Sequence, residues 1–166
     1  MMIVIADTSP IISLLKIDRL DLLSELFGLI FIPDAVYNEL TQNEKYRIEA
    51  ELIIHSDFIK NKKISNTQAV NILQNVMLLD NGESEAIILF DELKAQLLLI
   101  DERRGREIAE KLNIPISGTI GILIKAFEKN LLTRQEIFEY VDIFQQENRR
   151  FSRNLINLLK KRLGNE

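Results

Sequence analysis

Ile3-Val4-Ile5-Ala6-Asp7-Thr8-Ser9-Pro10 is an apolar run that stops on a carboxylate. Its four small or β-branched apolar residues show no polar alternation, which is typical of a parallel strand buried on both faces. Thr8 and Ser9 offer capping hydroxyls and Pro10 suits the first turn of a helix, so the stretch predicts a strand, a tight turn and a helix. Because open α/β sheets bind ligands outside the carboxyl ends of their strands, Asp7 falls at the expected functional edge.

A second apolar strand ends in the same way. Leu97-Leu98-Leu99-Ile100 is followed by Asp101 and Glu102. Shorter extended segments are expected at about residues 29–32, 58–64 and 114–117, the last an edge strand because it contains a proline. Helical patterns alternate with these strands. The sequence therefore predicts an α/β protein with three layers, α/β/α, around a central, mainly parallel sheet of four to five strands.

The length and composition set outer limits on the function. A chain of 166 residues fits one domain over residues 1–166, with helical patterns at about 133–166 that either pack on it or serve association. The absence of cysteine excludes disulfides, thiolate metal sites and cysteine nucleophiles, and the cytoplasm is the expected location. No window approaches the roughly 20 apolar residues of a membrane span, so no membrane partner is expected. A net charge of −4 argues against a globally basic surface, but it is compatible with clustered carboxylates.

Acidic residues from four predicted elements can meet at one crevice. Asp7 and Asp101 follow buried strands. Glu39 lies at the margin of the inward-facing side of the helix over residues 34–40, and Glu83 and Glu85 stand in the first turn of an apolar helix. Carboxylates that cluster raise one another's pKa unless a cation neutralises them, and oxygen ligands favour Mg²⁺ or Mn²⁺. Such ions support phosphodiester hydrolysis.

Each of these residues also has a simpler interpretation. A strand-terminal aspartate or a helix-start glutamate is by itself more often a turn or cap residue, and only the joint placement favours a site. Two groups of arginines are most simply solvated helix faces, with phosphate contact as the alternative. These are Arg103, Arg104 and Arg106, and Arg149, Arg150 and Arg153. The segment Gly118-Thr119-Ile120-Gly121 lacks the lysine of a phosphate loop and is interpreted as close helix packing.

These motifs together resemble the PIN domain family, and within it a PIN-like branch related to the VapC toxins. Asp7-Thr8-Ser9 is similar to the family's first acidic motif, Glu39 falls on the helix of its second, and Asp101 follows the strand of its last. The similarity extends over about residues 3–132 and the segment 150–152. It includes Gly82-Glu83-Ser84-Glu85-Ala86, the stretch from Leu99 to Arg106, and Gly118-Thr119-Ile120-Gly121.

The resemblance implies a metal-dependent endoribonuclease that acts on single-stranded RNA. On this hypothesis Mg²⁺ or Mn²⁺ is held by the carboxylates of Asp7, Glu39, Glu85 and Asp101, with Glu83 also a candidate ligand. The supporting residues are Thr8, Ser9 and Glu102, and phosphate contacts are expected from Arg103, Arg104 and Arg106. A homodimer, a toxin role and a small antitoxin partner are also implied.

The chain departs from the family pattern at two places. Glu83 and Glu85 stand where an aspartate is typical, and Glu85 is favoured because Ala86-Ile87-Ile88 follows it in the expected pattern. The pair after the last strand is Asp101-Glu102 where Asp-Asp is typical.

A rival hypothesis is a catalytically silent PIN-like module that binds nucleic acid or a protein partner. Such a module should be insensitive to Asp7→Asn and should bind RNA without divalent ions. A third interpretation, a phospho-acceptor domain using Asp7 or Asp101, would require a lysine at a strand end, and none stands out in the sequence.

Overall fold

The structure, a computed structural model, describes residues 2–147, 149 and 151–164. Within them a five-stranded sheet, parallel throughout, has the order β3-β2-β1-β4-β5. The strands are β1 (Val4–Ala6), β2 (Ile30–Pro33), β3 (Ile59–Lys62), β4 (Leu97–Leu99) and β5 (Ile116–Ser117). The helices are α1 (Thr8–Lys16), α2 (Asp21–Phe27), α3 (Asp34–Gln42), the 3-10 turn η1 (Glu44–Tyr46), α4 (Arg47–Ile54), α5 (Thr67–Met77), α6 (Asn81–Glu92), α7 (Arg103–Lys111), α8 (Thr119–Glu128), α9 (Arg134–Gln146) and α10 (Arg153–Arg162).

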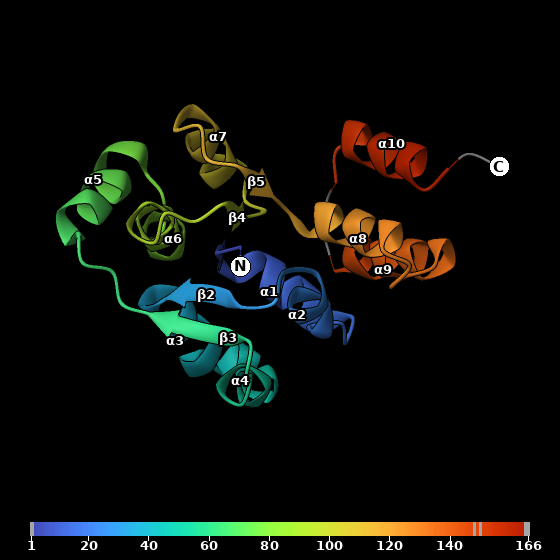
Figure 1. Ribbon diagram of the computed structural model, residues 1–166, viewed down its shortest axis with the longest axis horizontal. Helices are drawn as coiled ribbons and strands as arrows, with labels where there is room; N and C mark the ends of the chain where they lie inside the picture. The colour runs from blue at the N-terminus through green and yellow to red at the C-terminus, as the bar shows by residue number, and fades with distance from the viewer. Residues whose placement is uncertain (1, 148, 150, 165–166) are drawn as a thin grey trace.

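Two apolar clusters cover the opposite faces of this sheet. Val4 and Ala6 of β1 pack into one cluster with residues of α1, α2, α3, α8, α9 and α10. Ile5, which points the other way, packs with residues of α5, α6 and α7. Figure 1 shows α5, α6 and α7 on one side of the strands, and α1, α2 and α8 on the other. The predicted three-layer α/β/α architecture is confirmed.

The order of the strands reverses between β1 and β4. From β1 the chain adds β2 and β3 on one side, then crosses over to add β4 and β5 on the other (Figure 1). Ala6 pairs with Leu99, and the Asp7 amide donates to the Leu99 carbonyl at 2.9 Å. Such a reversal leaves a crevice at the carboxyl ends of the two strands, where ligands of α/β proteins bind. Asp7 and the residues that follow Leu99 therefore stand at this crevice.

Two helical regions near the site have local features of note. The helix that contains Glu83 begins at Asn81, because Asp80 and Glu83 form a reciprocal capping box at its start. The segment over residues 44–54 is divided into η1 and α4. The expected edge strand is present as β5. No helix in the described part of the chain is long and apolar enough to cross a membrane.

Candidate active site

Five carboxylates from four parts of the chain line one pocket at the reversal of strand order. They are Asp7 after β1, Glu39 of α3, Asp80 and Glu83 at the start of α6, and Glu102 after β4. The pocket has a volume of about 500 Å³ and is also lined by Thr8, Ser9, Arg103 and Arg104. We call it the acid pocket. Asp7 and Glu83 are buried in it, whereas Glu39, Asp80 and Glu102 are exposed.

Asp7 is the most deeply placed of these acids. It precedes the first residue of α1 with extended backbone angles, and its side chain makes no capping hydrogen bond to the helix. Gly82 lies close beside it, since a Cβ at that glycine would come within 3.1 Å of Asp7 Oδ1. Burial raises the pKa of Asp7 to about 8, and the negative charges of Asp80, Glu83 and Glu39 add to the rise. A cation at this carboxylate would reverse that effect.

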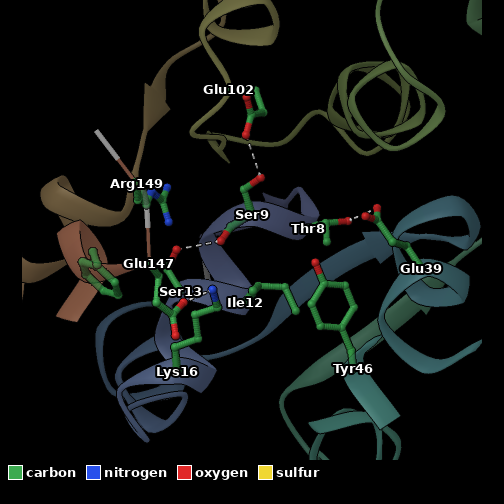
Figure 2. A pocket seen from close by; sticks show the side chains of 11 residues that line it. Thr8, Ser9, Ile12, Ser13, Lys16, Glu39, Tyr46, Glu102, Glu147 and Arg149 are labelled. Atoms are coloured by element: carbon green, nitrogen blue, oxygen red, sulfur yellow. Dashed lines mark hydrogen bonds and ion pairs between the residues drawn. The ribbon is translucent and has the colours of Figure 1, made fainter. Parts of the chain in front are cut away.

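The two hydroxyl residues after Asp7 hold two of the exposed acids. Thr8 Oγ1 donates to Glu39 Oε2 at 2.7 Å, and Ser9 Oγ donates to Glu102 Oε1 at 3.3 Å. Figure 2 shows both contacts, with Glu102 above Ser9 and Glu39 to the right of Thr8. The hydroxyls of Thr8 and Ser9 thus connect the start of α1 to the acids of two other elements.

Glu83 is oriented by its own helix terminus and by a glycine. Its carboxylate accepts from the Asp80 amide at 3.1 Å, and the Asp80 carboxylate accepts from the Glu83 amide at 2.8 Å. A Cβ at Gly105 of α7 would stand only 2.6 Å from Glu83 Oε1, so the glycine leaves the room that the carboxylate occupies. Burial raises the pKa of Glu83, and the charges of Asp80 and Glu102 raise it further.

Glu85, the other glutamate of the motif, does not line the acid pocket. Its Oε2 accepts from the Ala35 amide at 2.9 Å, in the first turn of α3. There it satisfies one of the free amides of a helix start. Of the two glutamates, the structure brings Glu83 and not Glu85 together with Asp7.

Asp101 also lies outside the acid pocket, although it follows the neighbouring strand. Its Oδ1 accepts from the Thr119 amide at 2.8 Å, its Oδ2 from Thr119 Oγ1 at 2.6 Å, and Arg149 forms an ion pair with it. A Cβ at Gly118 would come within 2.5 Å of Asp101 Oδ1. Gly118 and Thr119 therefore cradle this carboxylate, and the next residue, Glu102, occupies the acid pocket instead.

Asp80 is the acid that the sequence analysis did not single out. The pattern Asp80-Asn81-Gly82-Glu83 is a capping box, which would have indicated that Asp80 and Glu83 face each other at the helix start. Only the fold shows that this helix start adjoins the end of β1.

The arginines differ in their surroundings. Arg103 and Arg104 line the rim of the acid pocket, where Arg103 pairs with Glu107 and Arg104 donates to the Met77 carbonyl. Arg106 donates instead to the Ile100 carbonyl at 2.8 Å and lines a neighbouring pocket with Asp101. Arg149 is not a solvated residue, because it pairs with Asp101 and lies over the rings of Phe144 and Phe151. Arg150 is outside the described residues.

The oxygen atoms that line the acid pocket are of the kind that ligates a hard divalent cation. The carboxylate and hydroxyl oxygens that line it are ligands that Mg²⁺ and Mn²⁺ prefer, and burial together with neighbouring negative charge raises the pKa of two of the carboxylates, Asp7 and Glu83. In the described residues no three histidine, aspartate or glutamate side chains are close enough, as they stand, to hold a metal ion together. The pocket thus offers the ligand chemistry without forming a closed coordination cage.

A comparison with known proteins bears on this arrangement. A family model described as a PIN domain matches residues 3–165, which is nearly the whole chain. No curated protein matches the sequence.

Proposed function

Since this chain belongs to the PIN domain family, we propose that it is a metal-dependent endoribonuclease that hydrolyses phosphodiester bonds in single-stranded RNA. The family gives the chain a nuclease-type fold. The observation that supports the finer proposal is the convergence of Asp7, Glu39, Glu83 and Glu102 at the reversal of strand order. No side chain there is placed as a protein nucleophile with a histidine base, so water is the nucleophile in this proposal.

We assign the four carboxylates of Asp7, Glu39, Glu83 and Glu102 to the binding of Mg²⁺ or Mn²⁺. When bound, such an ion lowers the pKa of water and offsets the charge of the phosphate. Asp7, which is buried in the pocket, would hold the ion, and Thr8 and Ser9 would keep Glu39 and Glu102 available as further ligands through the hydrogen bonds that they donate to them. Glu85 and Asp101 have structural partners of their own, Ala35 and Arg149, and are assigned positioning roles.

Arg103 and Arg104 supply the positive charge that the acid pocket otherwise lacks. Both are exposed at its rim, within reach of solvent and of an approaching chain. Arginine binds phosphate through its planar fork of donors, so these two residues are assigned to the phosphates that flank the scissile bond.

The toxin role and the partners belong to the same proposal. The substrate is RNA, a small antitoxin is the inhibitor, and the working assembly is a homodimer. Exposed apolar side chains support the proposal that the protein associates with another chain. They are Ile48 and Leu52 of α4, and Ile72 and Val76 of α5. Size-exclusion chromatography with light scattering tests the dimer, and growth arrest on induction tests the toxin role.

The cleavage test uses purified protein and a labelled RNA that contains both a hairpin and single-stranded flanks. In Mn²⁺ the wild type should cut the flanks, EDTA should stop the reaction, and Asp7→Asn should lower the rate by at least a hundredfold while leaving the protein folded. Asp57→Asn, an exposed acid outside the pockets, serves as the control and should cut normally.

The silent binding module remains the competing function, favoured by the pairing of Asp101 with Arg149, which neutralises one expected ligand. It predicts RNA binding that is unaffected by EDTA and by Asp7→Asn, with no cleavage by the wild type. The same experiment therefore separates the two functions.

A further inference from the structure

A second, smaller pocket adjoins the acid pocket and shares Thr8, Ser9, Glu39 and Glu102 with it. It has a volume of about 200 Å³ and extends along α1 toward the segment after α9, as Figure 2 shows. Its further lining includes Ile12, Lys16, Tyr46, Phe144, Glu147 and Arg149. We call it the side pocket.

We propose that the side pocket binds one unpaired nucleobase of the RNA whose neighbouring phosphodiester lies in the acid pocket, and that Lys16 and Glu147 select the base. The proposal deepens the nuclease function above and rests on it. It makes Lys16, Glu147 and Tyr46 specificity-determining residues. None of the three lines the acid pocket.

The surfaces of the side pocket suit a flat, partly apolar ligand. Ile12 and Phe144 are buried and form apolar lining, and Tyr46 is half-buried. Figure 2 shows Tyr46 beside Ile12. The Lys45 ammonium lies over one face of the Tyr46 ring, 5.4 Å from its centroid. Unpaired bases of single-stranded RNA are bound in this way, by stacking on aromatic and apolar side chains.

The charges of the side pocket favour a neutral base over a phosphate. Lys16 forms an ion pair with Glu147, and Arg149 forms one with Asp101, so both cations are already neutralised. Glu39 and Glu102 would repel an additional phosphate at this position. The phosphate-binding role thus falls to the rim of the acid pocket. Arg104 forms no ion pair there within the described residues, and Arg103 pairs only with the exposed Glu107.

The size of the side pocket limits the ligand to a single ring system. Its volume of about 200 Å³ lies below the roughly 300–1,000 Å³ of pockets that take drug-sized ligands. Lys16 is a donor and Glu147 an acceptor, and both are partly exposed at the end of the pocket. A base whose edge carries an acceptor beside a donor can accept from Lys16 and donate to Glu147 while the two stay paired, and a base that lacks this pattern makes at most one of these contacts.

The Lys16–Glu147 pair could instead serve only to fasten the segment after α9 to α1. The two roles differ when the charges are exchanged. In the double variant Lys16→Glu/Glu147→Lys the ion pair can re-form, so a fastening role would be restored. Base selection would change, because donor and acceptor have exchanged places.

The test measures RNA binding in an Asp7→Asn background, which prevents cleavage. Fluorescein-labelled decamers of oligoadenylate, oligocytidylate and oligouridylate are titrated in Mn²⁺ and followed by fluorescence anisotropy. We expect the background protein to prefer one decamer. Lys16→Ala and Glu147→Gln should each reduce that preference at least fivefold. Lys160→Ala, an exposed lysine of α10 outside the pockets, should leave it unchanged.

The aromatic wall is tested in the same assay. Tyr46→Ala should weaken binding of all three decamers by about 5- to 150-fold, the range for loss of a stacked base, and Tyr46→Phe should bind like the parent. The charge exchange should keep the thermal midpoint and alter the order of the decamers.

The proposal is overturned if the background protein shows no preference, if Lys16→Ala and Glu147→Gln keep it, if the charge exchange restores the original order, or if Tyr46→Ala binds like the parent. Its failure differs from failure of the nuclease function. If the wild type cleaves RNA in Mn²⁺ while the preference is insensitive to Lys16 and Glu147, only the side pocket is refuted. If base selection behaves as expected and the wild type does not cleave, only the nuclease function is.

Discussion

Replacing Asp7 by asparagine should stabilise the metal-free protein at the same time as it abolishes cleavage. The Asp7 carboxylate is 3% exposed, makes no capping hydrogen bond and is surrounded by three other acids. Asparagine has nearly the same shape without the charge. The substitution therefore removes an electrostatic cost of folding and loses little packing.

The magnitude follows from the pKa of Asp7, which is about 8 in the folded protein against 3.8 ordinarily. Each pH unit between these values corresponds to about 1.4 kcal/mol. At pH 7 the folded protein holds this carboxyl mostly protonated, and the proton uptake on folding lowers the free energy of unfolding by about 4 kcal/mol. Because the folded-state pKa is the higher one, the folded protein binds more protons than the unfolded chain over this range. The wild type should therefore lose stability as the pH rises from about 4 to 8, and at pH 5 the cost should be only about 2 kcal/mol.

The assay is urea denaturation of the wild type and Asp7→Asn in EDTA at pH 5 and pH 8. The variant should be the more stable protein at both values, with a gap that widens by several kcal/mol toward pH 8. Asp57→Asn, at an exposed position, should follow the wild type. Adding Mn²⁺ should stabilise the wild type and not Asp7→Asn, because a bound cation stabilises only the form that binds it. A gap that does not change with pH would show that Asp7 does not have a raised pKa in the folded protein.

Further variants test individual contacts of the site. Thr8→Val removes the hydroxyl that donates to Glu39 and should lower Mn²⁺-dependent cleavage about 10- to 100-fold, whereas Thr8→Ser should retain most of it. Equal rates of the two variants would contradict the positioning role. Asp80→Ala and Thr133→Ala each break a capping box and should each lower the free energy of unfolding by about 1 kcal/mol in urea denaturation. Only Asp80→Ala should also weaken Mn²⁺ binding, because Thr133 caps α9 and does not line the acid pocket. Gly105→Ala should displace the Glu83 carboxylate and lower cleavage about tenfold, and an unchanged rate would show that the position of Glu83 is unimportant.

The sequence was sufficient for the elements and for the edge where the site lies. Uninterrupted apolar runs that end on acids, such as the one before Asp7, predicted parallel strands and placed the carboxylates at their carboxyl ends. The fold class is confirmed, and Asp7, Glu39 and Glu83 do line one pocket.

The choice between neighbouring acids could not be predicted in the same way. Whether Glu83 or Glu85 faces Asp7 depends on the residue at which α6 begins, and the capping box at Asp80 sets that start. Whether Asp101 or Glu102 enters the pocket depends on Thr119 and Arg149, which hold Asp101 from far along the chain.

The side pocket was also beyond prediction from the sequence. Its lining combines α1, η1 and the segment after α9, and no local pattern relates residues so distant in the chain. Lys16 and Glu147 in particular are ordinary surface residues by sequence and become neighbours only through the packing of α9.

A metal site at Asp7 is tested by calorimetric titration of the purified protein with Mn²⁺. The wild type should bind the ion, and Asp101→Asn, whose side chain lies outside the acid pocket, should bind it as well. Asp7→Asn should bind at least tenfold more weakly. Wild-type affinity in Asp7→Asn, or the absence of binding by the wild type, would contradict the assignment of a metal site to Asp7 and its neighbours.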